Sequence, residues 1–106
     1  MTEIPVAVRS MIEATNAGDS DAFERSFTED AYLEDWGRVF HGREGVRSWD
    51  RTDNIGKKAH FEAEGARQDG DDWIVTLTVT GGGFNGTSDI RFRVSGDLIS
   101  RMVITP

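Results

Sequence analysis

The first part of the chain places apolar residues at the spacing of a helix. Its stripe, with members three or four residues apart, consists of Ile4, Val8, Met11, Ile12 and Thr15. This spacing predicts an amphipathic helix that can include Pro5 in its first turn and end at Gly18. Residues on the stripe are expected to face the core.

Two shorter helices are predicted further along. The first has Asp19 or Ser20 as its cap, with Phe23 and Phe27 one turn apart on its buried face. The second runs from residue 43 to about residue 52 and follows a glycine. All helical signals therefore lie in the first half of the chain.

A short strand lies between these two helices. The run Ala31–Trp36 alternates with a period of two, which puts Leu33 and Asp35 on the same face. If Leu33 faces the core, Asp35 faces it too. A buried carboxylate is costly unless it is paired, hydrogen-bonded or protonated, so Asp35 is the leading candidate for chemistry. Gly37 then predicts a hairpin into a second strand.

After residue 59 the period changes from helical to two. Four strands are predicted around residues 59–65, 73–80, 90–94 and 98–104, separated by turns rich in Gly and Asp. Helices followed by hairpins indicate an α+β fold. We expect a cone-shaped barrel of a curved, mainly antiparallel sheet packed against three N-terminal helices, with room for an apolar pocket at its wide end.

Composition narrows the functional classes. The 106 residues fit a single domain, residues 1–106, and the chain has no cysteine for disulfides or thiolate metal sites. The net charge of −7 makes nucleic acid an unfavourable partner, and no apolar run is long enough to span a membrane. The segment Met1–Pro5 lacks the character of a signal peptide, so a cytoplasmic location is expected.

Several motifs carry a resemblance to known proteins. They are Asn16–Asp19, Phe27–Ala31, Glu34–Asp35, Phe40–Val46, Gly83–Thr87 and Gly96–Ile99. Together they resemble ketosteroid isomerases and SnoaL-like polyketide cyclases of the nuclear-transport-factor-2-like superfamily. The resemblance covers nearly the whole chain and implies the cone-shaped α+β fold. It identifies function less well, because this fold hosts isomerases, cyclases, epoxide hydrolases and non-catalytic binding modules.

The resemblance places Asp35 where the isomerases keep the carboxylate that moves a proton. The oxyanion-hole tyrosine of those enzymes is replaced here by Met11, and their second acid falls nearest Ile90. Asp89 is adjacent but points to the opposite face. Each lost oxyanion donor typically costs ~10²–10³ in rate, so steroid isomerisation is not expected.

Two functions stay open on the sequence. One is a small-molecule site with cofactor-independent proton transfer through Asp35. The other is a non-catalytic ligand-binding or dimerisation module in which Asp35 is structural, satisfied by nearby backbone or by Arg38 across the hairpin. Epoxide hydrolysis would need further carboxylate, arginine and amide groups near Asp35, and the sequence does not reveal them. The predicted apolar lining for a small apolar or polycyclic molecule is Met11, Phe27, Leu33, Trp49, Phe61, Ile90 and Phe92.

Other charged groups favour ordinary roles. Arg43, Arg47 and Arg51 form one helix stripe, which we interpret as a solvated face complementing the acidic first helices rather than an anion site. The run His60–Glu64 is a weak metal signal, so no metal and no cofactor are expected. The resemblance implies a homodimer formed through the polar sheet face that includes Thr78.

Overall fold

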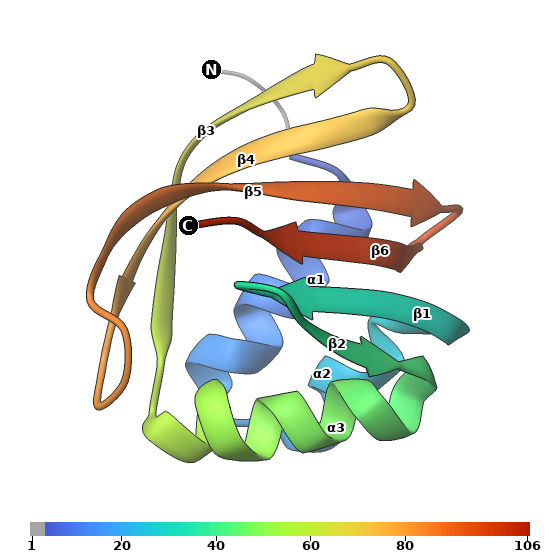
Figure 1. Cartoon of the computed structure of the whole chain (residues 1–106). Helices are drawn as coiled ribbons and strands as arrows, with labels where there is room; N and C mark the ends of the chain where they lie inside the picture. The colour runs from blue at the N-terminus through green and yellow to red at the C-terminus, as the bar shows by residue number, and fades with distance from the viewer. Residues whose placement is uncertain (1–3) are drawn as a thin grey trace.

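Six strands form one mixed sheet in the order β2-β1-β6-β5-β4-β3. Their bounds are β1 (Phe27–Asp35), β2 (Arg38–His41), β3 (His60–Asp69), β4 (Asp72–Thr80), β5 (Gly86–Ser95) and β6 (Leu98–Ile104). Neighbouring strands are antiparallel except β1 and β6, which run parallel. In this computed structural model, which describes residues 4–106, the sheet is open and strongly curved (Figure 1). Met1–Glu3, part of the segment examined for a signal peptide, lie outside the described residues.

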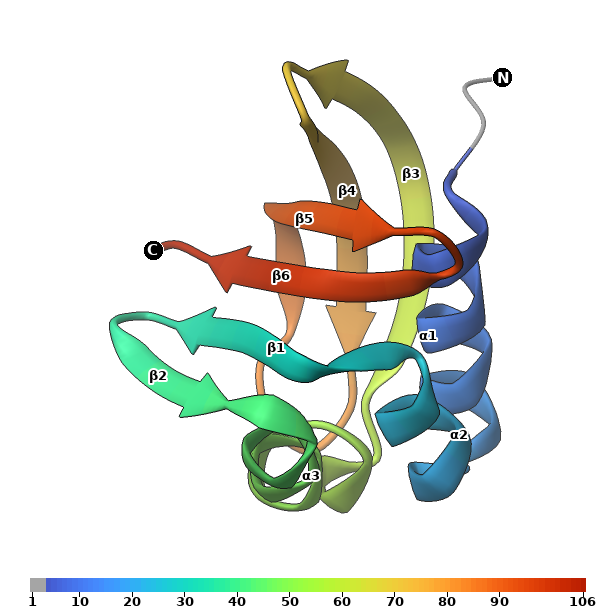
Figure 2. The same ribbon diagram turned by 90° about the vertical axis from the view of Figure 1, so that its right-hand side faces the viewer.

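Three α-helices pack on one side of the sheet: α1 (Val6–Ala17), α2 (Ser20–Arg25) and α3 (Gly42–Asp53), followed by the short 3₁₀ turn η1 (Ile55–Lys57). Helix α1 lies against β3 and β6, and α3 lies beneath β1 and β2 (Figure 2). Gly18 ends α1 with a φ of 70°, and the Asp19 side chain caps α2 by accepting a hydrogen bond from Ala22 N at 3.0 Å. The predicted α+β class is confirmed.

The core lies between the helices and the inner face of the sheet, and α3 contributes Val46 and Trp49 to it. Its largest fully buried side chains are Phe23, Phe27, Phe92, Met11, Leu33, Leu77, Ile99 and Met102. The prediction that Phe27 lies on the second helix is wrong, because Phe27 is the first residue of β1. Ile99 N donates to Ser26 O at 2.8 Å, and this bond directs the chain out of the helix and alongside β6. Phe23 and Phe27 still pack together, with ring centroids 5.2 Å apart.

The arginine stripe of α3 is only in part a solvated face, because Arg43 Nε donates to Phe27 O at 3.0 Å. Arg47 on α3 pairs with Glu24 on α2 at 2.7 Å, so this member of the arginine stripe complements the acidic second helix. On the outer sheet face, Arg93 donates to Asp72 at 2.8 Å. No helix within residues 4–106 is long and apolar enough to cross a membrane.

Candidate functional site

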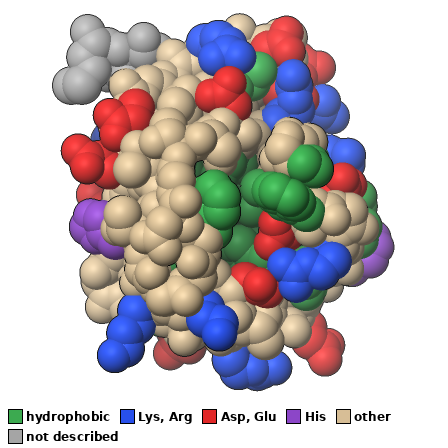
Figure 3. Space-filling model, turned by 60° about the vertical axis from the view of Figure 1, so that its left-hand side comes forward, with side chains coloured by type: hydrophobic (Ala, Val, Ile, Leu, Met, Phe, Trp, Pro, Cys, Tyr) green, Lys and Arg blue, Asp and Glu red, His purple; other side chains and the backbone are tan. Residues whose placement is uncertain are grey.

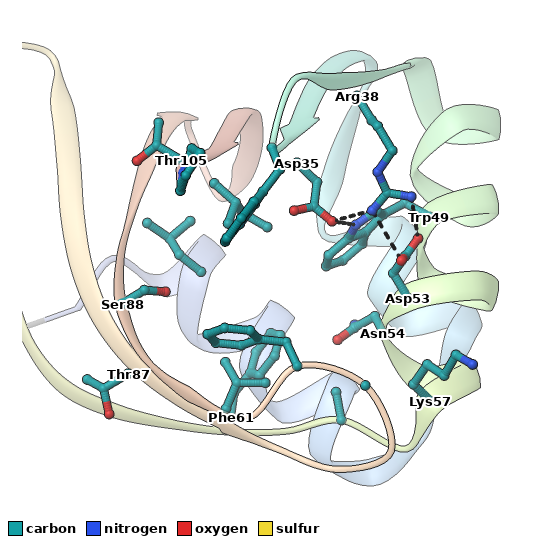
Figure 4. A pocket seen from close by; sticks show the side chains of 18 residues that line it. Asp35, Arg38, Trp49, Asp53, Asn54, Lys57, Phe61, Thr87, Ser88 and Thr105 are labelled. Atoms are coloured by element: carbon teal, nitrogen blue, oxygen red, sulfur yellow. Dashed lines mark hydrogen bonds and ion pairs between the residues drawn. The ribbon is translucent and has the colours of Figure 1, made fainter.

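A cavity of about 560 Å³ lies between α3 and the inner face of the sheet (Figure 4). Apolar side chains from the sheet line one wall: Phe61, Val79, Ile90 and Ile104. The facing wall is polar and consists of Asp35, Arg38, Asp53 and Asn54, with Trp49 between them. Figure 3 shows the hollow, with apolar side chains inside it and acidic and basic side chains at its edge. The cavity can therefore hold a small apolar body against a polar wall.

Asp35 is the last residue of β1 and lines the cavity, as its alternation with the fully buried Leu33 predicts. One carboxylate oxygen, Oδ2, accepts hydrogen bonds from Trp49 Nε1 at 2.9 Å and from Arg38 Nη2 at 2.7 Å. The other oxygen, Oδ1, accepts no hydrogen bond from the described residues and points into the cavity (Figure 4). Asp35 is thus anchored at one oxygen and open to a ligand at the other.

Arg38 links Asp35 to a second carboxylate. Its Nη2 and Nη1 donate to Asp53 Oδ1 and Oδ2 at 3.1 Å and 3.3 Å. Partial burial raises the pKa of Asp53, but hydrogen bonds from Thr52 and Arg38 outweigh it and hold that pKa below its ordinary value. The hydrogen bond to Asp53 in turn raises the pKa of Arg38. The polar wall therefore contains a fixed cation shared by two carboxylates.

Asn54 follows Asp53 at the end of α3 and is 1% exposed. Its side-chain nitrogen donates to Asp50 Oδ1 at 3.0 Å and to Thr15 Oγ1 at 3.1 Å. Asp50 also accepts from Ile55 N at 3.3 Å, and burial raises the pKa of the Asp50 carboxyl. The Asn54 side-chain oxygen is buried and has no hydrogen-bond partner among residues 4–106.

Two exposed aromatic side chains stand at the mouth of the cavity. Trp36 is 59% exposed and Phe84 is 54% exposed, and both line the opening. Trp36 has a φ of 50°, in the left-handed region that side chains other than glycine rarely adopt. The loop that carries Phe84 is closed by Asn85, which accepts from Gly81 N at 3.1 Å and donates to Gly81 O at 2.9 Å.

The predicted lining residues divide into two groups. Asp35, Trp49, Phe61 and Ile90 line the cavity. The others do not line it and are fully buried in the core: Met11, Phe27, Leu33 and Phe92. Only the first group is placed to contact a ligand in this cavity.

Sequence reasoning considered Arg38 as a partner of Asp35 but missed two residues of the polar wall. Asp53 lies four residues after Trp49 on the same face of α3, and this helical spacing could have revealed it. No sequence spacing indicated Asn54 in the same way, because the place of its side chain in the cavity wall depends on where α3 ends. The arginine, the second carboxylate and the amide that the sequence did not show near Asp35 are therefore present in the same cavity.

Other candidate groups lie elsewhere. Met11 is buried outside the cavity, and Ile90 lines it without a polar atom, so neither can stabilise an oxyanion. The His41 ring packs edge-on against Tyr32 at 5.6 Å, and His60 is exposed. Residues 4–106 contain no group of three or more His, Asp and Glu side chains that could hold a metal ion.

Similar solved structures share this fold. A protein from Sinorhizobium meliloti, provisionally named a polyketide cyclase, is 25% identical with a TM-score of 0.80 over 94% of each chain. The epoxide hydrolase/cyclase-like enzyme SalBIII, described in pyran ring formation in salinomycin, is 23% identical with a TM-score of 0.78 over 93% of this chain and 86% of its own. A protein from Kribbella flavida, provisionally named a ketosteroid isomerase, is 17% identical with a TM-score of 0.74 over 92% and 72%.

No curated protein matches the chain in sequence. The family model of the SnoaL-like domain, however, matches residues 8–102, which is most of the chain. The matched region runs from α1 to β6 and includes Asp35 and the whole of α3. The chain therefore belongs to the SnoaL-like domain family.

Proposed function

We propose that this SnoaL-like domain binds a small, largely apolar molecule in the cavity and moves a proton on it through Asp35, without a cofactor. One observation carries the proposal: the Asp35 carboxylate is fixed at Oδ2 by Trp49 and Arg38, while Oδ1 faces the cavity. The Asp35 side chain is only 16% exposed, so a bound ligand would exclude most of the remaining water. This is the geometry that a general base requires.

The same geometry limits the kind of substrate. A positioned base contributes typically ~10²–10⁴-fold to a rate, but the positions of the isomerase oxyanion donors are apolar here. The Ser88 hydroxyl, across the cavity from Asp35, is an available donor, whereas the Thr87 hydroxyl bonds Thr78 on the outer sheet face. We therefore propose a substrate whose C–H group is already acidic, as in the cyclase members of the superfamily, rather than a simple ketone.

Hydrolytic opening of an epoxide is the second candidate, because Arg38 joins Asp35 to Asp53 and Asn54 lines the same cavity. One carboxylate would take a proton from water as the water oxygen bonds to an epoxide carbon. The breaking C–O bond leaves an alkoxide that needs a proton. The lowered pKa of Asp53 makes its carboxyl poorly suited to supply that proton, so this reaction needs a further proton donor. Because of this additional requirement, epoxide hydrolysis is the second candidate, after proton transfer from a C–H group.

A direct test uses 5-nitrobenzisoxazole, a small aromatic probe with one acidic C–H bond. The base takes the C3 proton, the N–O bond breaks, and a coloured cyanophenolate forms. We expect turnover by the native protein and a loss of about 10²–10⁴-fold in kcat for Asp35→Asn, with probe binding retained. The matched control is Asp89→Asn, which removes an exposed carboxylate that bonds Thr76 on the outer sheet face.

The result also separates the alternatives. Binding of the probe with no turnover would favour a non-catalytic ligand-binding module in which Asp35 is structural. Conversion of styrene oxide to its diol, lost in Asp53→Asn, would favour epoxide hydrolysis. Equal turnover by the native protein and Asp35→Asn would contradict a catalytic role for Asp35.

A homodimer is part of the proposal. The outer sheet face carries β-branched and charged residues, including Thr78, which bonds Glu64 and Thr87 at 2.8 Å each. Such a face can pack against a second copy because its polar groups already have partners within the chain. Light scattering should give twice the 11.8 kDa chain mass, and a mass of one chain would contradict the dimer.

A further inference from the structure

The oxygen of the Asn54 side chain is a buried hydrogen-bond acceptor that the protein does not satisfy. It belongs to the polar wall of the cavity and is directed toward the interior of the cavity (Figure 4). A buried acceptor without a donor costs about 1–3 kcal/mol, so native proteins rarely keep one without a use. The position of this oxygen gives it a use only if a molecule inside the cavity brings the donor.

The orientation of the Asn54 side-chain amide is fixed by residues on the side away from the cavity. Asp50 Oδ1 acts as an acceptor here, because Ile55 N donates to it at 3.3 Å, and the nitrogen of Asn54 faces the same oxygen at 3.0 Å. Thr15 Oγ1 accepts from the same nitrogen at 3.1 Å. Rotating the amide by half a turn would set two oxygens against each other at Asp50. The oxygen is therefore the atom held toward the cavity, and Asp50 acts as its positioning residue.

The cavity thus presents two free acceptors on one wall, Asp35 Oδ1 and Asn54 Oδ1, facing an apolar wall. From this arrangement we infer that the natural ligand is an apolar molecule with a hydrogen-bond donor, a hydroxyl or an N–H group, that binds the Asn54 oxygen. This inference rests on the proposed binding function and names the class of its ligand. Asn54 would then distinguish a ligand that carries a hydrogen-bond donor at this position from one that carries only an acceptor there.

The test compares two probes of nearly equal size in titrations followed by fluorescence. One is 2-naphthol, which can donate, and the other is 2-methoxynaphthalene, which can only accept. We expect the native protein to bind 2-naphthol about tenfold more tightly, since one probe satisfies the buried oxygen and the other does not. In Asn54→Leu the two affinities should come within about twofold of each other.

Asp89→Asn, on the outer sheet face, is the matched control and should keep the preference for 2-naphthol. Asp35→Ala removes the other free acceptor of the wall and therefore tests which of the two oxygens binds the donor. If the preference disappears in Asp35→Ala and survives in Asn54→Leu, the donor binds Asp35 rather than Asn54, and the inference is overturned. If Asn54→Leu fails to fold, Asn54→Ser serves instead, because its shorter side chain can still donate to Asp50 while its oxygen withdraws from the cavity.

The two proposals fail in different ways. Equal binding of both probes by the native protein would overturn the inference about Asn54 and leave the binding function intact. If neither probe binds, the proposed binding function fails, and the inference that rests on it fails too.

Discussion

The two ends of the inner sheet face differ, although their sequence patterns are alike. At the filled end, α1 and α2 cover the sheet, and Met11, Phe27 and Phe92 pack without exposure. At the hollow end Phe61 and Ile90 line the cavity, with α3 on its other side. Ile90 and Phe92 are alternate residues of the same strand. Whether an inward-facing residue becomes core or cavity wall therefore depends on which helix lies opposite, and alternation does not reveal this.

Helix α3 contributes to both ends. Asp50 is buried toward α1, where its neighbour Asn54 contacts Thr15, while Asp53 faces the cavity and binds Arg38. Burial raises the pKa of the first carboxyl. The pKa of the second is lowered, since hydrogen bonds outweigh its partial burial. Two acids three residues apart thus experience opposite environments because they belong to different ends of the molecule.

The largest expected effect comes from shortening one side chain at each end. Phe92→Ala should lower the free energy of unfolding by about 3–5 kcal/mol, since it opens a void in a packed core. Ile90→Ala should cost only about 1–2 kcal/mol, because its side chain already borders empty space and loses fewer contacts. Urea denaturation of both variants measures the difference.

Ligand binding should show the reverse order. Ile90→Ala should weaken binding of 2-naphthol, and Phe92→Ala, under conditions where it remains folded, should leave that affinity nearly unchanged. Equal losses of stability in the two variants would contradict the division into a filled and a hollow end.

The next effect concerns the two acids of α3. Asp53 has a lowered pKa, so its stabilising contribution is present above its unfolded pKa of about 3.9 and is lost as pH falls through the lower folded value. Asp53→Asn should therefore cost about 0.5–1 kcal/mol at pH 7, and this cost should vanish in acid. Asp50 has a raised pKa, so the native protein gains stability from this group as pH falls through the folded value.

Asp50→Asn should accordingly be as stable as the native protein at neutral pH or more stable by about 1 kcal/mol, and the advantage should shrink as pH falls. The introduced amide keeps an oxygen that can accept from Asn54 and Ile55. Thermal unfolding between pH 7 and pH 3 measures both variants. If the stabilities of Asp50→Asn and Asp53→Asn changed with pH in parallel, the two acids would share one environment. That result would contradict the difference described between the two ends of the molecule.

The smallest effect is expected at the mouth of the hollow end. Trp36→Asn should stabilise the fold by about 0.5–1 kcal/mol, because asparagine adopts left-handed backbone angles more readily than tryptophan. The same change should weaken binding of 2-naphthol severalfold by removing an aromatic wall. The control is Val39→Asn, an exposed apolar residue of β2 that does not line the cavity. Unchanged affinity in Trp36→Asn would mean that the indole does not contact ligands.

The sequence supported a correct account of the fold because its local signals agree. Glycine and aspartate mark the boundaries at Gly18 and Asp19, and alternation puts Leu33 and Asp35 on the inner face. The start of β1 was not predictable in the same way. Phe27 continues a helical pattern, and only pairing with β6, distant in sequence, draws it into a strand.

The candidate site was predictable only in part. Asp35 could be found because an acid interrupts an apolar strand face, and Arg38 could be found because it lies across a hairpin. The unpaired oxygen of Asn54 could not, since it results from contacts of its nitrogen with Asp50 and with Thr15 on another helix. Empty space also leaves no mark in a sequence, and this explains why Met11 and Phe92 were expected to line a pocket.

The parallel pairing of β1 with β6 has a consequence for how this protein acquires its site. Asp35 lies beside Ile104 in that pairing, and Trp36 N donates to Ile104 O at 2.9 Å, so one wall of the cavity joins the first strand to the last. This pairing is strongly non-local, so the entropy of loop closure opposes it more than it opposes the hairpins. A chain that has formed its helices and hairpins but not this pairing has no binding site. A ligand that binds only the completed fold will therefore raise the free energy of unfolding of the whole chain by RT ln(1 + [L]/Kd), where [L] is the free ligand concentration.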